Sequence, residues 1–302
     1  MDNPIAEIKR LKAEKNAVIL AHYYTTDEIQ SVADYVGDSF YLAKVAKSSN
    51  ADIIVFCGVA FMGESAKILN PNKKVIMPDL SADCPMAHMA TKEKIKEMRE
   101  KYDDLAVVCY INSTAELKRM SDVCVTSANA MKIVNRLPNK NIFFIPDRNL
   151  GSYVKKHVKD KNIIINDGYC PIHHFFEISE LARLQEKYPD ALVLAHPECQ
   201  EELLKNADYI GSTSEIIDYV AESKADEFII CTERGVEYDL KTQNPDKKFY
   251  FADKGCMCDD MKLNTLEKLI DALRNEKNEV YIDETARIES LRPLERMLEL
   301  AK

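Results

Sequence analysis

The stretch Gly168-Tyr169-Cys170-Pro171-Ile172-His173-His174 places a cysteine between the end of a predicted strand and the start of a predicted helix. The same arrangement recurs along the chain. Cys84 lies 86 residues upstream of Cys170, and Cys256 and Cys258 lie 86 and 88 residues downstream. A feature that returns at one long period indicates a structural unit that is repeated.

Two further motifs repeat at the same offsets of 88 and 86 residues. Ala21-His22-Tyr23-Tyr24 aligns with residues 109–112 and 195–198, and the segment 33–39 aligns with 121–127 and 207–213. The chain therefore reads as one unit built three times. We predict repeats at 1–86, 87–172 and 173–258, and we expect the remaining segment 259–302 to pack back on the first repeat.

Each predicted repeat alternates helical periodicity with short apolar runs. The first helix feeds a strand at 17–21, 105–110 or 191–195, and later strands include 53–57, 142–145 and 228–231. Nearly continuous apolar strands that alternate with helices indicate parallel sheets covered on both faces. We predict an α/β protein of three αβα domains, related by a pseudo-threefold axis and arranged around a central site.

Composition excludes several classes of function. The 302 residues are 46% hydrophobic and 30% charged, with a net charge of −9, which disfavours a nucleic-acid surface. The apolar runs are too short to span a membrane, and the stretch 1–16 lacks the apolar core of a signal peptide. We expect a cytoplasmic protein whose nine cysteines are thiols or metal ligands.

Polar residues follow the predicted strands, at the sheet edge where ligands of parallel α/β proteins bind. His22 and Tyr24, Tyr110 and Asn112, and His196 and Glu198 follow the first strand of each repeat. Ser39, Ser127 and Thr213 are expected at helix starts, where free N–H groups suit a carboxylate or phosphate, although each could be a plain N-cap. Three facing repeats would bring all these residues to one pocket.

One cysteine from each repeat would make an open ligand set at the centre. All-thiolate ligation suits zinc or iron–sulfur, but a structural zinc site needs a fourth ligand and is usually built from local C-x2-C pairs. A cubane cluster held by three cysteines keeps one iron free. Helix N-termini beside the thiolates are expected to lower their pKa values. The alternative is that these cysteines merely end their strands.

The motifs together resemble the quinolinate synthase A family over nearly the whole chain. The resemblance rests on Ala21-His22-Tyr23-Tyr24, Gly37-Asp38-Ser39, the run from Cys57 to Leu69, Tyr110-Ile111-Asn112-Ser113, Thr126-Ser127-Ala128-Asn129-Ala130, Pro146-Asp147-Arg148-Asn149-Leu150-Gly151, Gly168-Tyr169-Cys170-Pro171-Ile172-His173, Ala195-His196-Pro197-Glu198-Cys199 and Gly211-Ser212-Thr213-Ser214. Gly63 stands where the family usually has alanine, and we expect this change to matter little.

The resemblance implies a [4Fe–4S] cluster with one iron not bound by protein. Its ligands would be Cys84, Cys170 and one of Cys256 and Cys258. The family's ligand is typically followed at a short fixed spacing by methionine, and Met261 keeps this spacing from Cys258, so we predict Cys258. The strict 86-residue repeat favours Cys256 instead.

The resemblance also implies a reaction, the condensation of iminoaspartate with dihydroxyacetone phosphate in NAD biosynthesis. Its products are quinolinate, phosphate and water, and an aspartate oxidase or dehydrogenase would act upstream. The expected catalytic residues are Glu198 as the leading base, with Tyr24, Tyr110, His196 and His22. The expected substrate-binding residues are His22, Ser39, Tyr110, Asn112, Ser127, His196, Glu198 and Thr213. The open iron would act as a Lewis acid.

Other functions fit parts of this pattern. Another [4Fe–4S]-dependent hydro-lyase acting on a small hydroxy acid could use the same residues. An iron–sulfur redox sensor usually carries a basic DNA-binding element, and this acidic chain has none in its sequence. A metal-free solute-binding protein of three domains is a third alternative.

Overall fold

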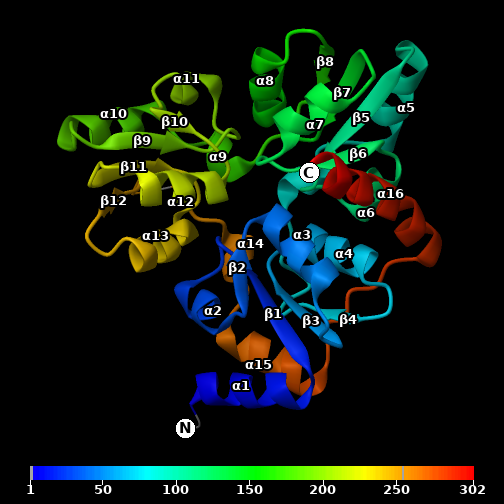
Figure 1. Cartoon of the computed structure of the whole chain (residues 1–302), viewed down its shortest axis with the longest axis vertical. Coiled ribbons are helices and arrows are strands. Elements are labelled where there is room, and N and C mark those ends of the chain that lie inside the picture. Colours follow the sequence, from blue (N-terminus) through cyan, green and yellow to red (C-terminus); the bar gives the residue numbers. More distant parts are fainter. Residues whose placement is uncertain (1–2, 254) are drawn as a thin grey trace.

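The computed structural model describes residues 3–253 and 255–302; Met1, Asp2 and Lys254, which fall within the predicted first and third repeats, lie outside the described residues. Three parallel four-stranded sheets form the molecule, and they share one strand order: second, first, third, fourth. The predicted α/β class with three parallel sheets is confirmed. Figure 1 shows the sheets arranged around a common centre, each flanked by its own helices.

The strands and helices of the three repeats correspond in order. The first repeat contains α1 (Pro4–Glu14), β1 (Ala17–His22), α2 (Asp27–Val32), β2 (Tyr35–Gly37), α3 (Ser39–Ser48), β3 (Ile53–Cys57), α4 (Ala60–Leu69), β4 (Lys74–Ile76) and the 3-10 turn η1 (Pro85–His88). The second contains α5 (Lys92–Lys101), β5 (Leu105–Tyr110), α6 (Ala115–Arg119), β6 (Val123–Val125), α7 (Ala130–Arg136), β7 (Asn141–Ile145), α8 (Arg148–His157), β8 (Asn162–Ile165) and α9 (Pro171–His174).

The third repeat and the C-terminal segment complete the chain. The third repeat contains α10 (Ile178–Lys187), β9 (Leu192–Ala195), α11 (Glu201–Leu204), β10 (Tyr209–Ile210), α12 (Thr213–Glu222), β11 (Glu227–Cys231), the 3-10 turn η2 (Arg234–Val236), α13 (Glu237–Gln243), β12 (Lys248–Tyr250) and α14 (Asp259–Lys262). Two helices follow, α15 (Leu266–Asn275) and α16 (Glu284–Leu300).

An aspartate at the start of each second strand ties it to the first strand. The Oδ2 atoms of Asp34, Asp122 and Asp208 accept hydrogen bonds from the N–H groups of Ile19, Val107 and Val193 at 2.9, 2.7 and 2.8 Å. Because the bond recurs at equivalent positions, the repetition in sequence corresponds to a repetition of tertiary contacts.

The helix expected at Ser127 begins three residues later, so this part of the prediction is wrong. Residues 126–129 form a turn in which the Thr126 N–H donates to Asn129 Oδ1 at 2.7 Å, and α7 starts at Ala130. In the other repeats Asp38 and Ser212 are the N-caps. Ser39 and Thr213 are therefore the first residues of α3 and α12 and not their caps.

The C-terminal helices pack in two places, whereas the sequence placed all of 259–302 on the first repeat. Helix α15 lies against α1, and α16 lies mainly against α6 and β6 of the second repeat. On α16, Leu294 and Met297 are fully buried, and Ser290 Oγ donates to the Ala115 carbonyl at 2.9 Å. The apolar face of α16 therefore fits a surface of the second repeat.

Ion pairs and backbone bonds fix the link between these helices. Glu276 bridges Lys15 and Lys74, with N–O distances of 2.6 Å to each. The Val280 N–H donates to the Val75 carbonyl at 2.8 Å beside β4. Within the described part of the chain, no helix combines the length and apolarity that crossing a membrane requires.

Candidate functional site

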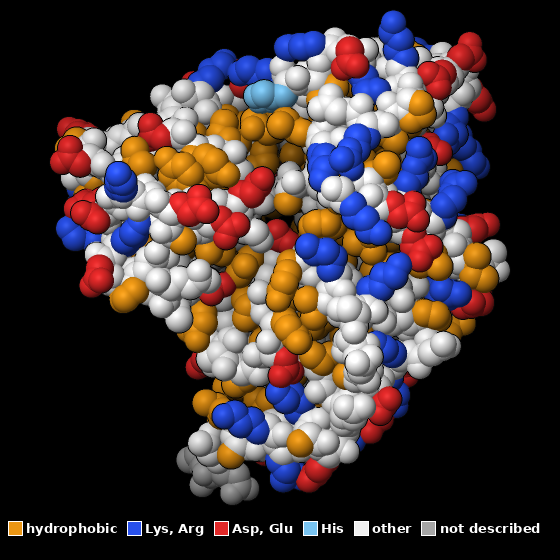
Figure 2. All heavy atoms as spheres, in the orientation of Figure 1, with side chains coloured by type: hydrophobic (Ala, Val, Ile, Leu, Met, Phe, Trp, Pro, Cys, Tyr) orange, Lys and Arg blue, Asp and Glu red, His pale blue; other side chains and the backbone are white. Residues whose placement is uncertain are grey.

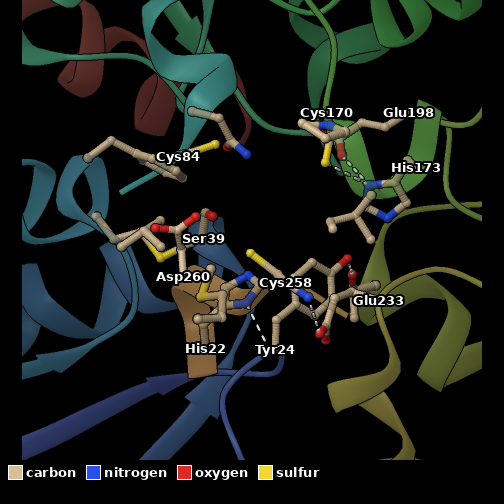
Figure 3. A pocket seen from close by; sticks show the side chains of 18 of the residues that line it. His22, Tyr24, Ser39, Cys84, Cys170, His173, Glu198, Glu233, Cys258 and Asp260 are labelled. Carbon is tan, nitrogen blue, oxygen red and sulfur yellow. Dashed lines mark hydrogen bonds and ion pairs between the residues drawn. The ribbon is translucent and has the colours of Figure 1, made fainter. Parts of the chain in front are cut away.

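A cavity of about 190 Å³ lies where the three repeats meet, and every residue predicted for the site lines it. These residues are His22, Tyr24, Ser39, Cys84, Tyr110, Asn112, Ser127, Cys170, His196, Glu198, Thr213 and Cys258. The surface in Figure 2 is hollowed near this junction. Figure 3 shows the thiols of Cys84, Cys170 and Cys258 pointing from three loops into one space.

Two histidines at strand ends are held in the same tautomer. His22 Nδ1 accepts the Tyr24 N–H at 3.1 Å, and His196 Nδ1 accepts the Glu198 N–H at 3.3 Å. Burial, with Lys262 nearby, lowers the pKa of His22 to about 3, and burial lowers that of His196 to about 3. Both rings are therefore neutral near pH 7, and the hydrogen-bond partners assign the proton of each to Nε2.

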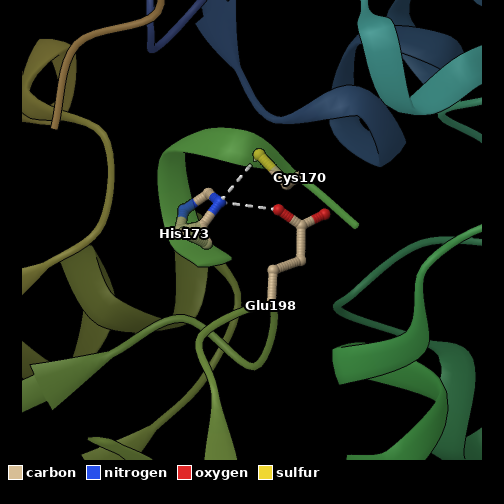
Figure 4. A group of neighbouring side chains, drawn as sticks. All are labelled: Cys170, His173 and Glu198. Carbon is tan, nitrogen blue, oxygen red and sulfur yellow. Dashed lines mark hydrogen bonds and ion pairs between the residues drawn. The ribbon is translucent and has the colours of Figure 1, made fainter. Parts of the chain in front are cut away.

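Glu198 forms a tight buried contact with His173 (Figure 4). Glu198 Oε2 lies 2.7 Å from His173 Nδ1, which is also 3.2 Å from Cys170 Sγ. Burial alone would raise the pKa of Glu198, but the neighbouring His173 and His196 lower it to about 2. The carboxylate is therefore ionised at neutral pH and can accept a proton.

Hydrogen bonds continue from His173 across the cavity wall to the first repeat. His173 Nε2 lies 2.9 Å from Thr232 Oγ1, which lies 2.9 Å from the Tyr24 hydroxyl. Tyr24 in turn contacts Thr213 Oγ1 at 2.7 Å. Burial raises the pKa of Tyr24 well above its ordinary value, so the phenol stays protonated. The chain connects a carboxylate to a phenol through groups that both donate and accept protons.

The three cysteine loops share one backbone bond. The N–H groups of Ala60, Arg148 and Arg234 donate to the carbonyls of Ala82, Gly168 and Cys256 at 2.8, 2.7 and 2.8 Å. Each of these carbonyls lies two residues before a cysteine that lines the cavity. Cys258 is therefore the structural counterpart of Cys84 and Cys170. The segment from the N–H donor to the cysteine spans 24 residues in the first and third repeats and 22 in the second, so equivalent cysteines do not keep a constant 86-residue spacing.

Cys256 points away from the cavity. It is 3% exposed, and its Sγ lies 3.2 Å from the Ala252 carbonyl inside the core of the third repeat. The strict 86-residue spacing favoured Cys256. In the structure, however, the residue that occupies the position equivalent to Cys84 and Cys170 is Cys258.

The expectation of lowered cysteine pKa values is wrong for the metal-free thiols. Each cysteine does precede a one-turn helix, at η1, α9 or α14. Burial nevertheless raises the pKa of Cys84 and Cys170 and raises that of Cys258 to about 11. Repulsion between thiolates adds to this effect: the charge of Cys258 raises the pKa of Cys84, and the charge of Cys84 raises the pKa of Cys170. Three converging thiolates therefore need a cationic centre.

A second donor set overlaps the first. Ligand atoms of Cys170, His173 and Glu198 lie within 4.8 Å of one another and could hold a single metal ion. The three equivalent cysteine loops fit a larger, symmetric centre, since each repeat contributes one thiol from the same position.

Polar atoms without partners lie at the cavity. Within residues 3–253 and 255–302, Glu198 Oε1, Asn112 Oδ1 and Thr126 Oγ1 are buried and form no hydrogen bond. Such atoms are costly unless a ligand satisfies them. Among the described residues that line the cavity there is no lysine or arginine. An anionic ligand would therefore be bound by N–H and O–H groups.

Sequence reasoning missed Thr232, Glu233 and Gly235, which follow β11. Glu233 is fully buried, and its Oε1 lies 3.0 Å from Lys262 Nζ. A Cβ atom on Gly235 would lie 2.6 Å from the Tyr23 carbonyl oxygen, so glycine permits the first and third repeats to approach. The 86-residue offset aligns Thr232-Glu233 with Pro146-Asp147, and this alignment could have pointed to them.

Comparisons with known proteins agree over almost the full length. A family described as "NadA: Quinolinate synthetase A protein" matches residues 6–299. The chain is 57% identical over 294 residues to a protein from Fusobacterium nucleatum named quinolinate synthase, covering 97% of this chain and 98% of that protein. Proteins of the same name from Caldicellulosiruptor saccharolyticus and Clostridioides difficile are 51% and 48% identical, each covering 98% of this chain and 97% of the relative.

Proposed function

Because this chain belongs to the quinolinate synthetase A family, we propose how its central cavity carries out that family's reaction. The protein is an enzyme with quinolinate synthase activity, which condenses iminoaspartate with dihydroxyacetone phosphate to give quinolinate, phosphate and water. The observation that supports our assignment of the site is the convergence of three equivalent cysteine loops on one cavity.

Cys84, Cys170 and Cys258 would hold a [4Fe–4S] cluster. The donor set supports this assignment, because three thiols from equivalent loops that line one cavity suit an iron–sulfur centre and leave one iron without a protein ligand. When bound, the cluster supplies a Lewis acid that polarises an oxygen of the substrate and assists the loss of water. The nine cysteines are all free thiols, from which we also infer a cytoplasmic location.

The substrates would be bound by neutral donors. The Nε2–H groups of His22 and His196 and the hydroxyls of Ser39, Ser127 and Thr213 line the cavity and can donate to carboxylate or phosphate oxygens. Buried Asn112 Oδ1 and Glu198 Oε1 can accept from an imine N–H or a hydroxyl of the substrates. Binding through dipoles leaves the anions free of tight ion pairs when phosphate departs.

Glu198 would abstract the protons whose removal allows imine and enamine forms to interconvert. Its ionised carboxylate is positioned by His173, and the hydrogen-bonded path through Thr232 leads to the Tyr24 hydroxyl. Tyr24 and Tyr110 would donate and accept protons near the triose fragment. Iminoaspartate arises by oxidation of aspartate, so we infer that an aspartate oxidase or dehydrogenase acts before this enzyme.

Single serine replacements at Cys84, Cys170, Cys256 and Cys258 test the cluster assignment. After anaerobic purification and reconstitution, iron and sulfide are measured for each variant together with quinolinate formation. Cys256→Ser is the matched control, because its side chain lies in the same loop but outside the cavity. We expect the control to keep its cluster and the other three to lose it. A cluster retained by Cys258→Ser, or lost from Cys256→Ser alone, would contradict the assignment.

A further inference from the structure

Two buried carboxylates hold the backbone of two of the cysteines. Asp147 Oδ2 accepts the N–H of Cys170 at 3.1 Å, and Glu233 Oε1 accepts the N–H of Cys258 at 3.0 Å. Both acids are 0% exposed. They occupy equivalent positions, directly before the arginines whose N–H groups bond to the same loops.

The second oxygen of each carboxylate is also engaged. Asp147 Oδ1 accepts the Leu150 N–H at 2.6 Å, and Glu233 Oε2 accepts the Gly235 N–H at 2.6 Å. Each acid therefore connects the turn after the third strand of its repeat to the loop that carries the cysteine. Fully satisfied buried bonds of this kind restrict the loop to one geometry.

The first repeat lacks this arrangement. Val59 occupies the position equivalent to Asp147 and Glu233, and the Cys84 N–H bonds to the side chain of its neighbour Asp83 at 2.7 Å. Asp83 is partly exposed and cannot tie the loop to another element in the same way. A buried carboxyl group that accepts the cysteine N–H is thus present in only two of the three described loops, so it does not follow from the repeated fold alone.

We propose that Asp147 and Glu233 are positioning residues that fix the Cys170 and Cys258 thiols toward the cavity and so retain the iron–sulfur cluster. This inference rests on the proposed cluster ligands. Loops that are ordered before the metal binds lose less conformational entropy on binding, and groups that orient metal ligands typically change metal affinity about 10–100-fold.

Amide substitutions break these bonds with little change in volume. In Asp147→Asn or Glu233→Gln, one oxygen becomes an NH2 donor, which must face a backbone N–H that also donates. Asp208→Asn is the matched control: Asp208 accepts one backbone N–H at 2.8 Å in the third repeat, and its amide can keep that bond while the NH2 group faces solvent.

The experiment measures how fast anaerobically reconstituted protein loses iron to a ferrous chelator. The visible circular dichroism spectrum of the cluster is recorded for each variant, and the stability of each metal-free form is measured by urea unfolding. We expect iron loss about 10–100-fold faster in Asp147→Asn and Glu233→Gln, with altered cluster spectra, and parent behaviour in Asp208→Asn. Altered spectra separate positioning from a general loss of stability. If either amide variant fails to fold, Glu233→Asp, which keeps the carboxyl group but shortens the side chain by one methylene, is expected to lose iron faster as well.

The outcomes separate the two proposals. A parent protein that binds no iron and sulfide would contradict the proposed cluster itself. A parent with a full cluster, together with folded Asp147 and Glu233 variants that match its iron-loss rate and spectrum, would overturn the positioning role and leave the cluster assignment standing.

Discussion

Glu198→Gln removes the group that we assign as the main base while changing the volume of the side chain little. The substitution replaces a carboxylate that lies 2.7 Å from His173 Nδ1, and the amide oxygen can still accept that hydrogen bond. The variant is therefore expected to fold, with a cost of about 1–3 kcal/mol from weakened buried bonds. The cluster should remain bound, because Glu198 does not hold a cysteine backbone.

The expected kinetic effect is large. A positioned base contributes about 10²–10⁴-fold to the rate, which corresponds to roughly 3–5 kcal/mol of the activation barrier. The surrounding histidines lower the pKa of Glu198 to about 2, so the parent carboxylate is fully ionised across the neutral range. The glutamine amide has no carboxylate to ionise, so raising the pH should not restore the activity of the variant.

The assay follows quinolinate formed from dihydroxyacetone phosphate and iminoaspartate generated in the reaction mixture, at equal iron content for each protein. Glu202→Gln, an exposed glutamate on α11 in the same repeat, is the control and should keep parent activity. A Glu198→Gln enzyme with a full cluster and turnover within about tenfold of the parent would refute the reasoning, because it falls below the range for a positioned base.

The remaining predictions concern packing and pH. In urea unfolding, Gly235→Ala should lower the free energy of unfolding by about 1–3 kcal/mol, because its Cβ would meet backbone atoms. Gly63→Ala should be nearly neutral, because the gain in helix propensity of about 0.5–1 kcal/mol offsets a shift of the flexible Met77 side chain. Equal losses of stability in the two variants would contradict this reasoning. Glu276→Gln should destabilise the protein by less than about 1 kcal/mol near neutral pH. Hydrogen bonds from Lys15 and Lys74 lower the pKa of Glu276 from 4.5 to about 2. The stabilisation by Glu276 is therefore complete above pH 4.5 and disappears as the pH falls toward 2. A difference in unfolding free energy between parent and variant that persists at pH 2 would contradict this prediction.

The sequence by itself determined the triplication and the order of elements. Apolar runs and helical periodicity are local properties, so strands such as β1 and β5 were predicted almost to the residue. The recurrence of cysteines and strand-end polar residues at 86–88 residues indicated which side chains would face a shared centre. A repeat in sequence permits this prediction because residues at equivalent positions of similar units lie at equivalent positions in the folded structure.

Only the tertiary structure decided how the repeats meet. It distinguished Cys258 from Cys256, because loop length shifts structural equivalence away from sequence spacing. It showed that the cysteine pKa values are raised and not lowered. Burial, which depends on all three repeats together, raises these pKa values by more than the following helix N-termini, which the local sequence encodes, lower them. It also placed Glu233 against the Cys258 backbone and α16 on the second repeat. These contacts join residues far apart in the chain, and no local pattern specifies them.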